Sequence, residues 1–231
     1  MDFELCIDSL KEALVAKQMG LKRVELCSGL EVGGLTPSYG LISSCVEVGG
    51  VEVHVMIRPN GGSFVYSDED FQIMQKDILG AGTAKAAGVV FGVLTKDNRL
   101  DYQKNAGMVH FAKTQNLECT FHRAIDLSSN WELDLEDLIE IGFDRVLTSG
   151  GASKAIDGID QIAKMKKKAA GRIEIMAGSG VNPNNALMLS KVKVDALHFT
   201  ARKTIDKNDD FCFGTDIEVD QTKIEEILKH F

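Results

Sequence analysis

The sequence is poor in proline, has no excess of positive charge and contains no long hydrophobic run. Three prolines in 231 residues leave no proline-rich segment that would mark a linker between domains. The formal net charge of −8 disfavours a nucleic-acid-binding protein, because such proteins usually present a basic surface. No stretch approaches the roughly 18 apolar residues of a transmembrane helix. We therefore expect one globular domain, residues 1–231, with neither nucleic acid nor membrane as a partner.

The amino terminus lacks the basic start and apolar core of a signal peptide, which predicts a cytoplasmic protein. The cysteines are odd in number, scattered, and nowhere spaced as Cys-x-x-Cys, so we expect free thiols rather than a disulfide framework. They are Cys6, Cys27, Cys45, Cys119 and Cys212.

Short strand-like runs alternate with helical stretches along the whole chain. The expected strands are residues 3–8, 23–28, 52–58, 88–94, 118–126, 144–149, 173–179 and 196–202. Eight strand–helix units in this length predict an α/β fold of the (β/α)8 TIM-barrel type. A doubly wound open sheet is the alternative. It is disfavoured because the first strand is followed by IDSLKE, without the glycine fingerprint of dinucleotide-binding sheets.

Alternate positions of the expected strands differ in character. In EVHVMIR (52–58), apolar residues alternate with His54, Met56 and Arg58, and the triplet Glu-Leu-Cys occurs at both 4–6 and 25–27. Because residues i and i+2 of a strand share a face, the apolar set should pack under the helices and the polar set should line the barrel interior. Burying so many ionisable groups is costly unless they are paired or solvated, which favours a functional interior.

Two chemistries suit this polar interior. Glu25, Arg58, His122 and Asp126 are the candidate catalytic residues, since an imidazole beside carboxylates and a cation can perform general acid–base work. The last two lie in FHRAID, where they share the inward alternation.

The second chemistry is metal binding. Cys6, Cys27, Met56 and His54 are the candidate metal ligands, because thiolate, thioether and imidazole suit soft metal ions. The cofactor expected from this set is a soft metal ion.

Two glycine-rich turns end expected strands and precede helices, TSGG (148–151) and AGSG (177–180). Glycines allow backbone N–H groups to approach an anion, so these turns predict a phosphate-type site, with tight turns as the alternative explanation. The candidate anion-binding residues are Ser149, Gly150, Gly151, Gly178, Ser179 and Gly180.

An ordered series of motifs along nearly the whole chain resembles the CutC family: RVELC, GGLTPS, IRPNGGSFVYSD, GVVFGVLT, FHRAID, RVLTSGG, MAGSGV and ALHFTAR. The resemblance implies a cytosolic TIM-barrel-like protein, an ascribed role in copper handling and copper bound at Cys6 and Cys27. The chain departs from the family pattern Arg-Pro-Arg-Gly-Gly-Asp-Phe, since Asn60 replaces the second arginine and Ser63 the aspartate. The lost positive charge weakens an anion clamp in this loop.

Two functions therefore stay open. One is a Cu(I)-binding copper homeostasis protein, and the other is a lyase-, isomerase- or aldolase-like enzyme for a small anionic, perhaps phosphorylated, metabolite. No lysine lies on an inward strand position, which disfavours a Schiff-base mechanism. The expected partners are a copper ion or a small anionic ligand, and a homo-oligomer is expected on the general frequency of symmetric assemblies.

Overall fold

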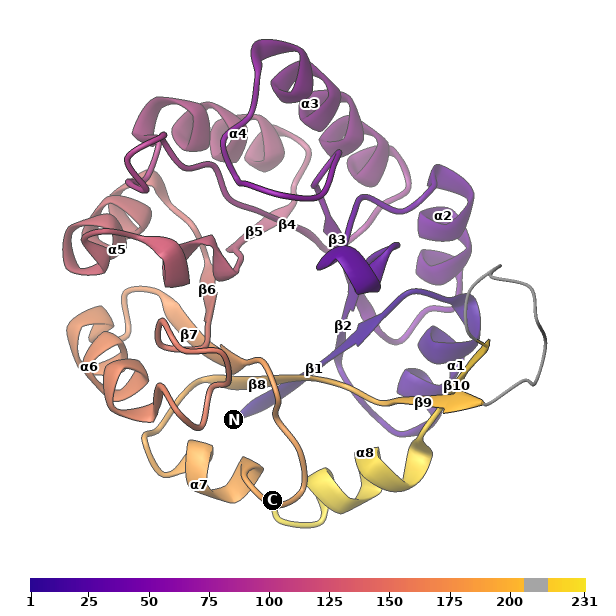
Figure 1. Cartoon of the computed structure of the whole chain (residues 1–231). Coiled ribbons are helices and arrows are strands. Elements are labelled where there is room, and N and C mark those ends of the chain that lie inside the picture. The colour runs from indigo at the N-terminus through magenta and orange to yellow at the C-terminus, as the bar shows by residue number, and fades with distance from the viewer. Residues whose placement is uncertain (206–215) are drawn as a thin grey trace, which may run out of the picture.

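Eight parallel strands close into a barrel in which each strand pairs with its sequence neighbours and β1 pairs with β8 (Figure 1). The arrangement comes from a computed structural model that describes residues 1–205 and 216–231. The strands are β1 Asp2–Ile7, β2 Arg23–Leu26, β3 Glu52–Met56, β4 Gly88–Phe91, β5 Glu118–Phe121, β6 Arg145–Thr148, β7 Glu174–Gly178 and β8 Ala196–Thr200. The TIM-barrel fold predicted from the alternation of elements is confirmed.

The helices form a ring around the barrel (Figure 1). They are α1 Leu10–Gln18, α2 Tyr39–Glu47, α3 Asp68–Thr83, α4 Tyr102–Thr114, α5 Trp131–Ile141, α6 Ile159–Ala169, α7 Ala186–Ser190 and α8 Gln221–Leu228. Two 3-10 helices, Leu30–Val32 and Arg123–Leu127, follow β2 and β5, and an antiparallel pair, β9 Arg202–Ile205 and β10 Asp216–Val219, lies outside the barrel. Among the described helices, none has the length and apolar character needed to cross a membrane.

Side chains of the sequence start several of these helices. The Ser9 hydroxyl accepts the N–H of Glu12 at the start of α1, and the Glu12 carboxylate accepts the N–H of Asp8 in return. At the start of α3 the Ser67 hydroxyl accepts the N–H of Asp70 and the Asp70 carboxylate accepts the N–H of Ser67, which is a capping box. These local bonds satisfy backbone donors that would otherwise be left without partners at the helix start.

The apolar face of the strands packs under the helices, as the alternation predicts. Val53, Val55 and Ile57 are at most 2% exposed and belong to the main hydrophobic core between barrel and helices. Cys45 and Cys119 are buried in the same core as free thiols, whereas Cys212 lies outside the described residues. The opposite face of the strands points into the barrel and carries the polar residues.

The fifth strand is shorter than predicted. β5 ends at Phe121, and the side chain of the next residue, His122, accepts the N–H of Ala124, which turns the chain into the 3-10 helix Arg123–Leu127. Asp126 therefore does not lie on a strand, and the inward alternation predicted for it is wrong.

Strand register explains where each inward side chain lies along the barrel axis. Cys6 pairs with Glu25, and Glu25 pairs with His54, but the strands of a closed barrel tilt, so this path descends the barrel from one strand to the next. His54 consequently lies near the amino-terminal end of the barrel. Its ring fits there because Gly88 has no side chain, and its Nε2 lies 3.8 Å from a carboxylate oxygen of Glu118.

Substitutions on the two faces of β3 should have unequal effects. Val55→Asp places an unpaired carboxylate in the main core and should lower the free energy of unfolding by roughly 4 kcal/mol or more. His54→Gln should cost far less, because neither ring nitrogen of His54 has a hydrogen-bond partner among the described residues. Chemical denaturation midpoints measure both effects, and an equal drop for the two variants would show that the assignment of faces is wrong.

Candidate functional site

A cavity of about 680 Å³ opens at the carboxyl end of the barrel strands. This is the end at which barrel enzymes of this architecture place their active sites. The predicted residues that line it are Cys6, Glu25, Cys27, Met56, Arg58, His122, Ser179 and Gly180, whereas His54, Asp126, Ser149, Gly150, Gly151 and Gly178 do not. The sequence thus predicted both the thiols and part of the polar lining.

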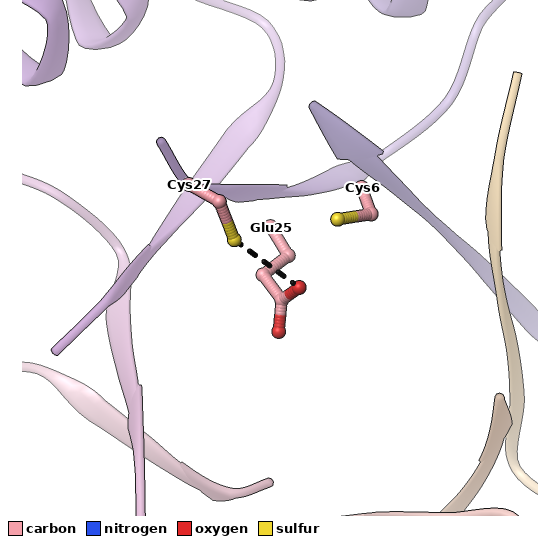
Figure 2. A group of neighbouring side chains, drawn as sticks. All are labelled: Cys6, Glu25 and Cys27. Carbon is pink, nitrogen blue, oxygen red and sulfur yellow. Dashed lines mark hydrogen bonds between the residues drawn. The ribbon is translucent and has the colours of Figure 1, made fainter. Parts of the chain in front are cut away.

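Cys6 on β1, Glu25 on β2 and Cys27 directly after β2 lie together in the cavity lining (Figure 2). Their ligand atoms, two sulfurs and a carboxylate oxygen, all lie within 4.8 Å of one another. The Cys27 thiol donates to Oε2 of Glu25 over 3.5 Å, while Oε1 has no partner among the described residues. The duplicated Glu-Leu-Cys triplet therefore builds one cluster. Its thiols are offset by the barrel stagger, because Cys6 is level with Glu25 rather than with Cys27.

A second polar group lies directly below the thiols. The Glu4 carboxylate is fully buried, accepts a hydrogen bond from Arg23 Nε at 2.7 Å and lies 2.8 Å from Nδ1 of His198. Nε2 of the same imidazole lies 3.7 Å from Glu25, so His198 connects the two carboxylates. Arg23 and His198 were missing from the predicted site residues, although the alternation of β2 and β8 places both on inward positions.

These contacts separate the ionisation of the two thiols. The neighbouring Cys27 thiol and His198 outweigh burial and lower the pKa of Cys6 from 9.0 to about 5. The same Cys6–Cys27 contact, together with burial, raises the pKa of Cys27 well above its ordinary value. Cys6 is therefore the thiolate of the pair at neutral pH, and Cys27 keeps its proton.

The carboxylates divide in the same way. Burial alone would raise the pKa of Glu4, but His198 and Arg23 outweigh it and hold that pKa at about 2. Burial and the nearby Cys6 instead raise the pKa of Glu25 well above its ordinary value. Burial opposes the protonation of His198, yet Glu25, Cys6 and Glu4 together raise its pKa well above 6.5. Glu4 is thus the carboxylate that stays charged, and Glu25 is the more easily protonated of the two.

One wall beside the thiols is apolar and sulfur-rich. Met56 and Val90 pack with Cys6 and Cys27 in a small cluster that Leu30 covers. The second predicted class of donor, the thioether, is therefore present beside the thiols. His54 does not line the cavity, because it lies lower in the barrel beside Glu118, and its role as a metal ligand stays a prediction. Burial there lowers the pKa of His54 to about 3.

Arg58 joins the two long loops that follow β2 and β3. Its terminal nitrogens donate to the carbonyls of Val32, Gly34 and Gly62, and its guanidinium carbon lies 5.2 Å from the centre of the Phe64 ring. These carbonyls occupy most of its donors. Its positive charge also helps to lower the pKa of the neighbouring His122.

The TSGG turn does not serve the cavity. The N–H groups of Ser149 and Gly151 donate to the carboxylate of Asp126, and Arg123 pairs with the same carboxylate over 2.9 Å. The anion that this turn binds is therefore an aspartate of the chain itself. These N–H groups are therefore not free to bind a ligand, and the anion-binding role of Ser149, Gly150 and Gly151 and the catalytic role of Asp126 stay predictions.

The AGSG turn does reach the cavity, through Ser179 and Gly180. Gly178 lies just below, where its missing side chain leaves space for Leu147 and His198. Two lysines that sequence reasoning missed, Lys154 after β6 and Lys223 in α8, also line the opening. Their sequence context carries no motif, so only the folded arrangement shows that they meet at this opening.

Comparison with known proteins agrees with this architecture. The model of the CutC family matches residues 1–203. The chain belongs to the CutC family. A CutC family protein of Histophilus somni is 44% identical over 203 residues, covering 87% of this chain and 83% of the relative. One of Vibrio atlanticus is 43% identical over 204 residues, covering 88% and 83%.

A solved structure of a CutC protein has the same fold as this chain. The crystal structure of a Streptococcus agalactiae protein named as a copper homeostasis protein CutC superposes with a TM-score of 0.81 at 35% identity, covering 86% of this chain and 97% of that one. The 3-hexulose-6-phosphate synthase of Salmonella typhimurium superposes with a TM-score of 0.63 at 14% identity over the full length of both chains. At that identity the second likeness shows the shared barrel alone.

The ionisation of the thiols can be tested by alkylation. In chelator-treated protein, the iodoacetamide reaction of Cys6 should show a midpoint near pH 5, because His198 and Cys27 stabilise the thiolate. Cys45 and Cys119 should stay unreactive through neutral pH, since burial raises their pKa values to about 11 and 12. Peptide mass spectrometry at stepped pH measures each site separately. In His198→Gln the Cys6 midpoint should move upward, and an unchanged midpoint would contradict the role of His198.

Proposed function

We propose that the chain binds one Cu(I) ion at the base of the cavity, through the sulfurs of Cys6 and Cys27. The observation that carries this proposal is the convergence of the two thiols, whose sulfurs and the Glu25 carboxylate lie within 4.8 Å of one another. A metal bridging two thiolates at bonds of roughly 2.3 Å needs sulfurs no more than about 4.6 Å apart. Small side-chain rotations would bring the pair to that distance.

The surrounding donors suit a soft monovalent ion. Met56 adds a thioether next to the thiols, and Val90 and Leu30 supply an apolar wall that offers no oxygen ligand. Thiolate and thioether select Cu(I), whereas carboxylates and water suit Mg²⁺ or Ca²⁺. Membership of the CutC family and the copper homeostasis name of the Streptococcus agalactiae relative support the same metal.

Copper competition tests the proposal. Against a bicinchoninate-type chelator, Cys6→Ser/Cys27→Ser should lose roughly 100-fold or more of the Cu(I) affinity, because both soft donors become hydroxyls. Met56→Leu should weaken binding less, since it removes the third donor and keeps the side-chain volume. Cys45→Ala is the matched control, because its thiol is buried under α2 and away from the cavity.

Affinity of the double variant equal to that of the parent would show that the cysteines only line the cavity. A loss in Cys45→Ala as large as that in the double variant would point to unfolding rather than to lost ligands. Circular dichroism of each variant separates these two causes.

The enzyme alternative remains a prediction. No lysine lies on the strands of the described barrel, so a Schiff base would have to come from Lys154 or Lys223 at the opening.

A further inference from the structure

The cavity is much larger than a copper site needs. Its volume of about 680 Å³ falls within the range of roughly 300–1,000 Å³ that is typical of small-molecule sites. The thiols occupy only its base, and the groups above them take no part in holding a metal ion. Those groups include an unpaired imidazole, two lysines and a turn of free backbone N–H groups.

The imidazole of His122 has a defined proton. It is 4% exposed, and its Nδ1 accepts the N–H of Ala124 at 3.2 Å, so Nδ1 carries no proton. Burial and the charge of Arg58 lower its pKa to about 3, which keeps the ring neutral. The remaining proton is therefore on Nε2, and Nε2 has no hydrogen-bond partner among the described residues. A buried N–H without an acceptor is costly, and this ring lines the cavity.

The ring of His122 is also held in place. Phe64 packs against it with tilted rings whose centres are 4.4 Å apart. Gly92 leaves the space that the ring needs, since an added Cβ there would lie 2.8 Å from Nδ1. A fixed, neutral N–H donor on the wall of a cavity is suited to an acceptor oxygen of a ligand, a carbonyl or a hydroxyl.

Another part of the lining carries two lysines. Lys154 and Lys223 both line the cavity, and neither has an ion-pair partner in the part of the chain that the structure describes, unlike Lys166, which pairs with Asp195. Beside them, the N–H groups of Gly180 and Val181 have no acceptor among residues 1–205 and 216–231. Unpaired lysines and free backbone N–H groups are the chemistry that binds phosphate oxygens.

The loops that carry these groups are joined to each other. The Ser179 hydroxyl donates to the carbonyl of Ser153, and the N–H of Ala155 donates to the carbonyl of Ser179. The stem of Lys154 lies against Gly180, 3.1 Å from the place of a Cβ. The Lys154 side chain and the free N–H groups are therefore already side by side when no ligand is bound.

We propose that this cavity binds a small phosphate monoester that carries a carbonyl or hydroxyl oxygen. Its phosphate lies against Lys154, Lys223 and the N–H groups of Gly180 and Val181, and its second oxygen accepts the Nε2–H of His122. The proposal goes beyond copper binding and does not depend on it, because none of these groups is a sulfur ligand. Lys223 lies outside residues 1–203, the part of the chain that the CutC family model matches.

Calorimetry on metal-free protein tests the ligand class. Dihydroxyacetone phosphate and glycerol 3-phosphate should bind more tightly than inorganic phosphate, and dihydroxyacetone and glycerate should not bind measurably. Lys154→Met/Lys223→Met should weaken ester binding about 10-fold or more, which is the loss expected for charged phosphate contacts. The control Lys22→Met/Lys85→Met removes the same charge from exposed lysines before β2 and β4, at the other end of the barrel, and should bind as the parent does.

Several outcomes would overturn the proposal. Absence of ester binding at millimolar concentration, equal binding by the two lysine double variants, or glycerate binding as tightly as the phosphate esters would each do so. Failure of copper binding is a separate result, because Cys6→Ser/Cys27→Ser should keep ester affinity and Lys154→Met/Lys223→Met should keep Cu(I) affinity.

The part played by His122 has its own readout. A long-range ¹H–¹⁵N spectrum should show the Nε2-protonated neutral ring from pH 5 to pH 8, and dihydroxyacetone phosphate should shift the Nε2 resonance. His122→Phe keeps a ring against Phe64 and should lose most of the preference for the ester over inorganic phosphate. An Nε2 resonance that does not move on saturation, or an unchanged preference in the variant, would remove His122 from the site.

Discussion

The buried carboxylate of Glu4 holds the barrel together at the point where the ring of strands closes. Its strand, β1, lies between β2 and β8, and its oxygens bind Arg23 from one neighbour and His198 from the other. A fully buried charge without partners is strongly destabilising, and removing one partner of such a group costs about 3–5 kcal/mol. The closure of the barrel and the charge state of the cavity base are therefore set by the same three side chains.

This network also limits the pH range in which the base of the cavity is complete. The pKa of Glu4 falls from 4.5 to about 2 on folding, so its stabilisation is present above pH 4.5 and is lost as the pH falls toward 2. The pKa of His198 is raised, so its contribution is full below pH 6.5 and is lost as the pH rises through the raised value. Because His198 also lies next to Cys6, a substitution of Glu4 would change the pKa of Cys6 through His198.

The sequence predicted the barrel and its inward faces because a period of two residues is a local property. Height along the barrel axis is not local. His54 alternates correctly with Met56, yet strand tilt places it at the other end from the thiols. A sequence also does not show whether a backbone N–H group already has a hydrogen-bond acceptor within the chain. TSGG has the composition of an anion cradle, but its N–H groups already bind Asp126, which a turn after Phe121 carries to them.

The protonation states of the groups around Cys6 and Cys27 keep the electrostatic cost of exchanging a proton for Cu(I) low. Before binding, Cys6 is a thiolate that faces the His198 cation, and Cys27 holds a proton shared with Glu25. Binding of Cu(I) to both sulfurs would add one positive charge and release the Cys27 proton, which leaves the net charge of the buried cluster unchanged. Changes of net charge in a desolvated interior are costly, so a one-for-one exchange avoids most of that penalty. Copper affinity at this site should consequently rise with pH, because each Cu(I) ion displaces the proton of the Cys27 thiol.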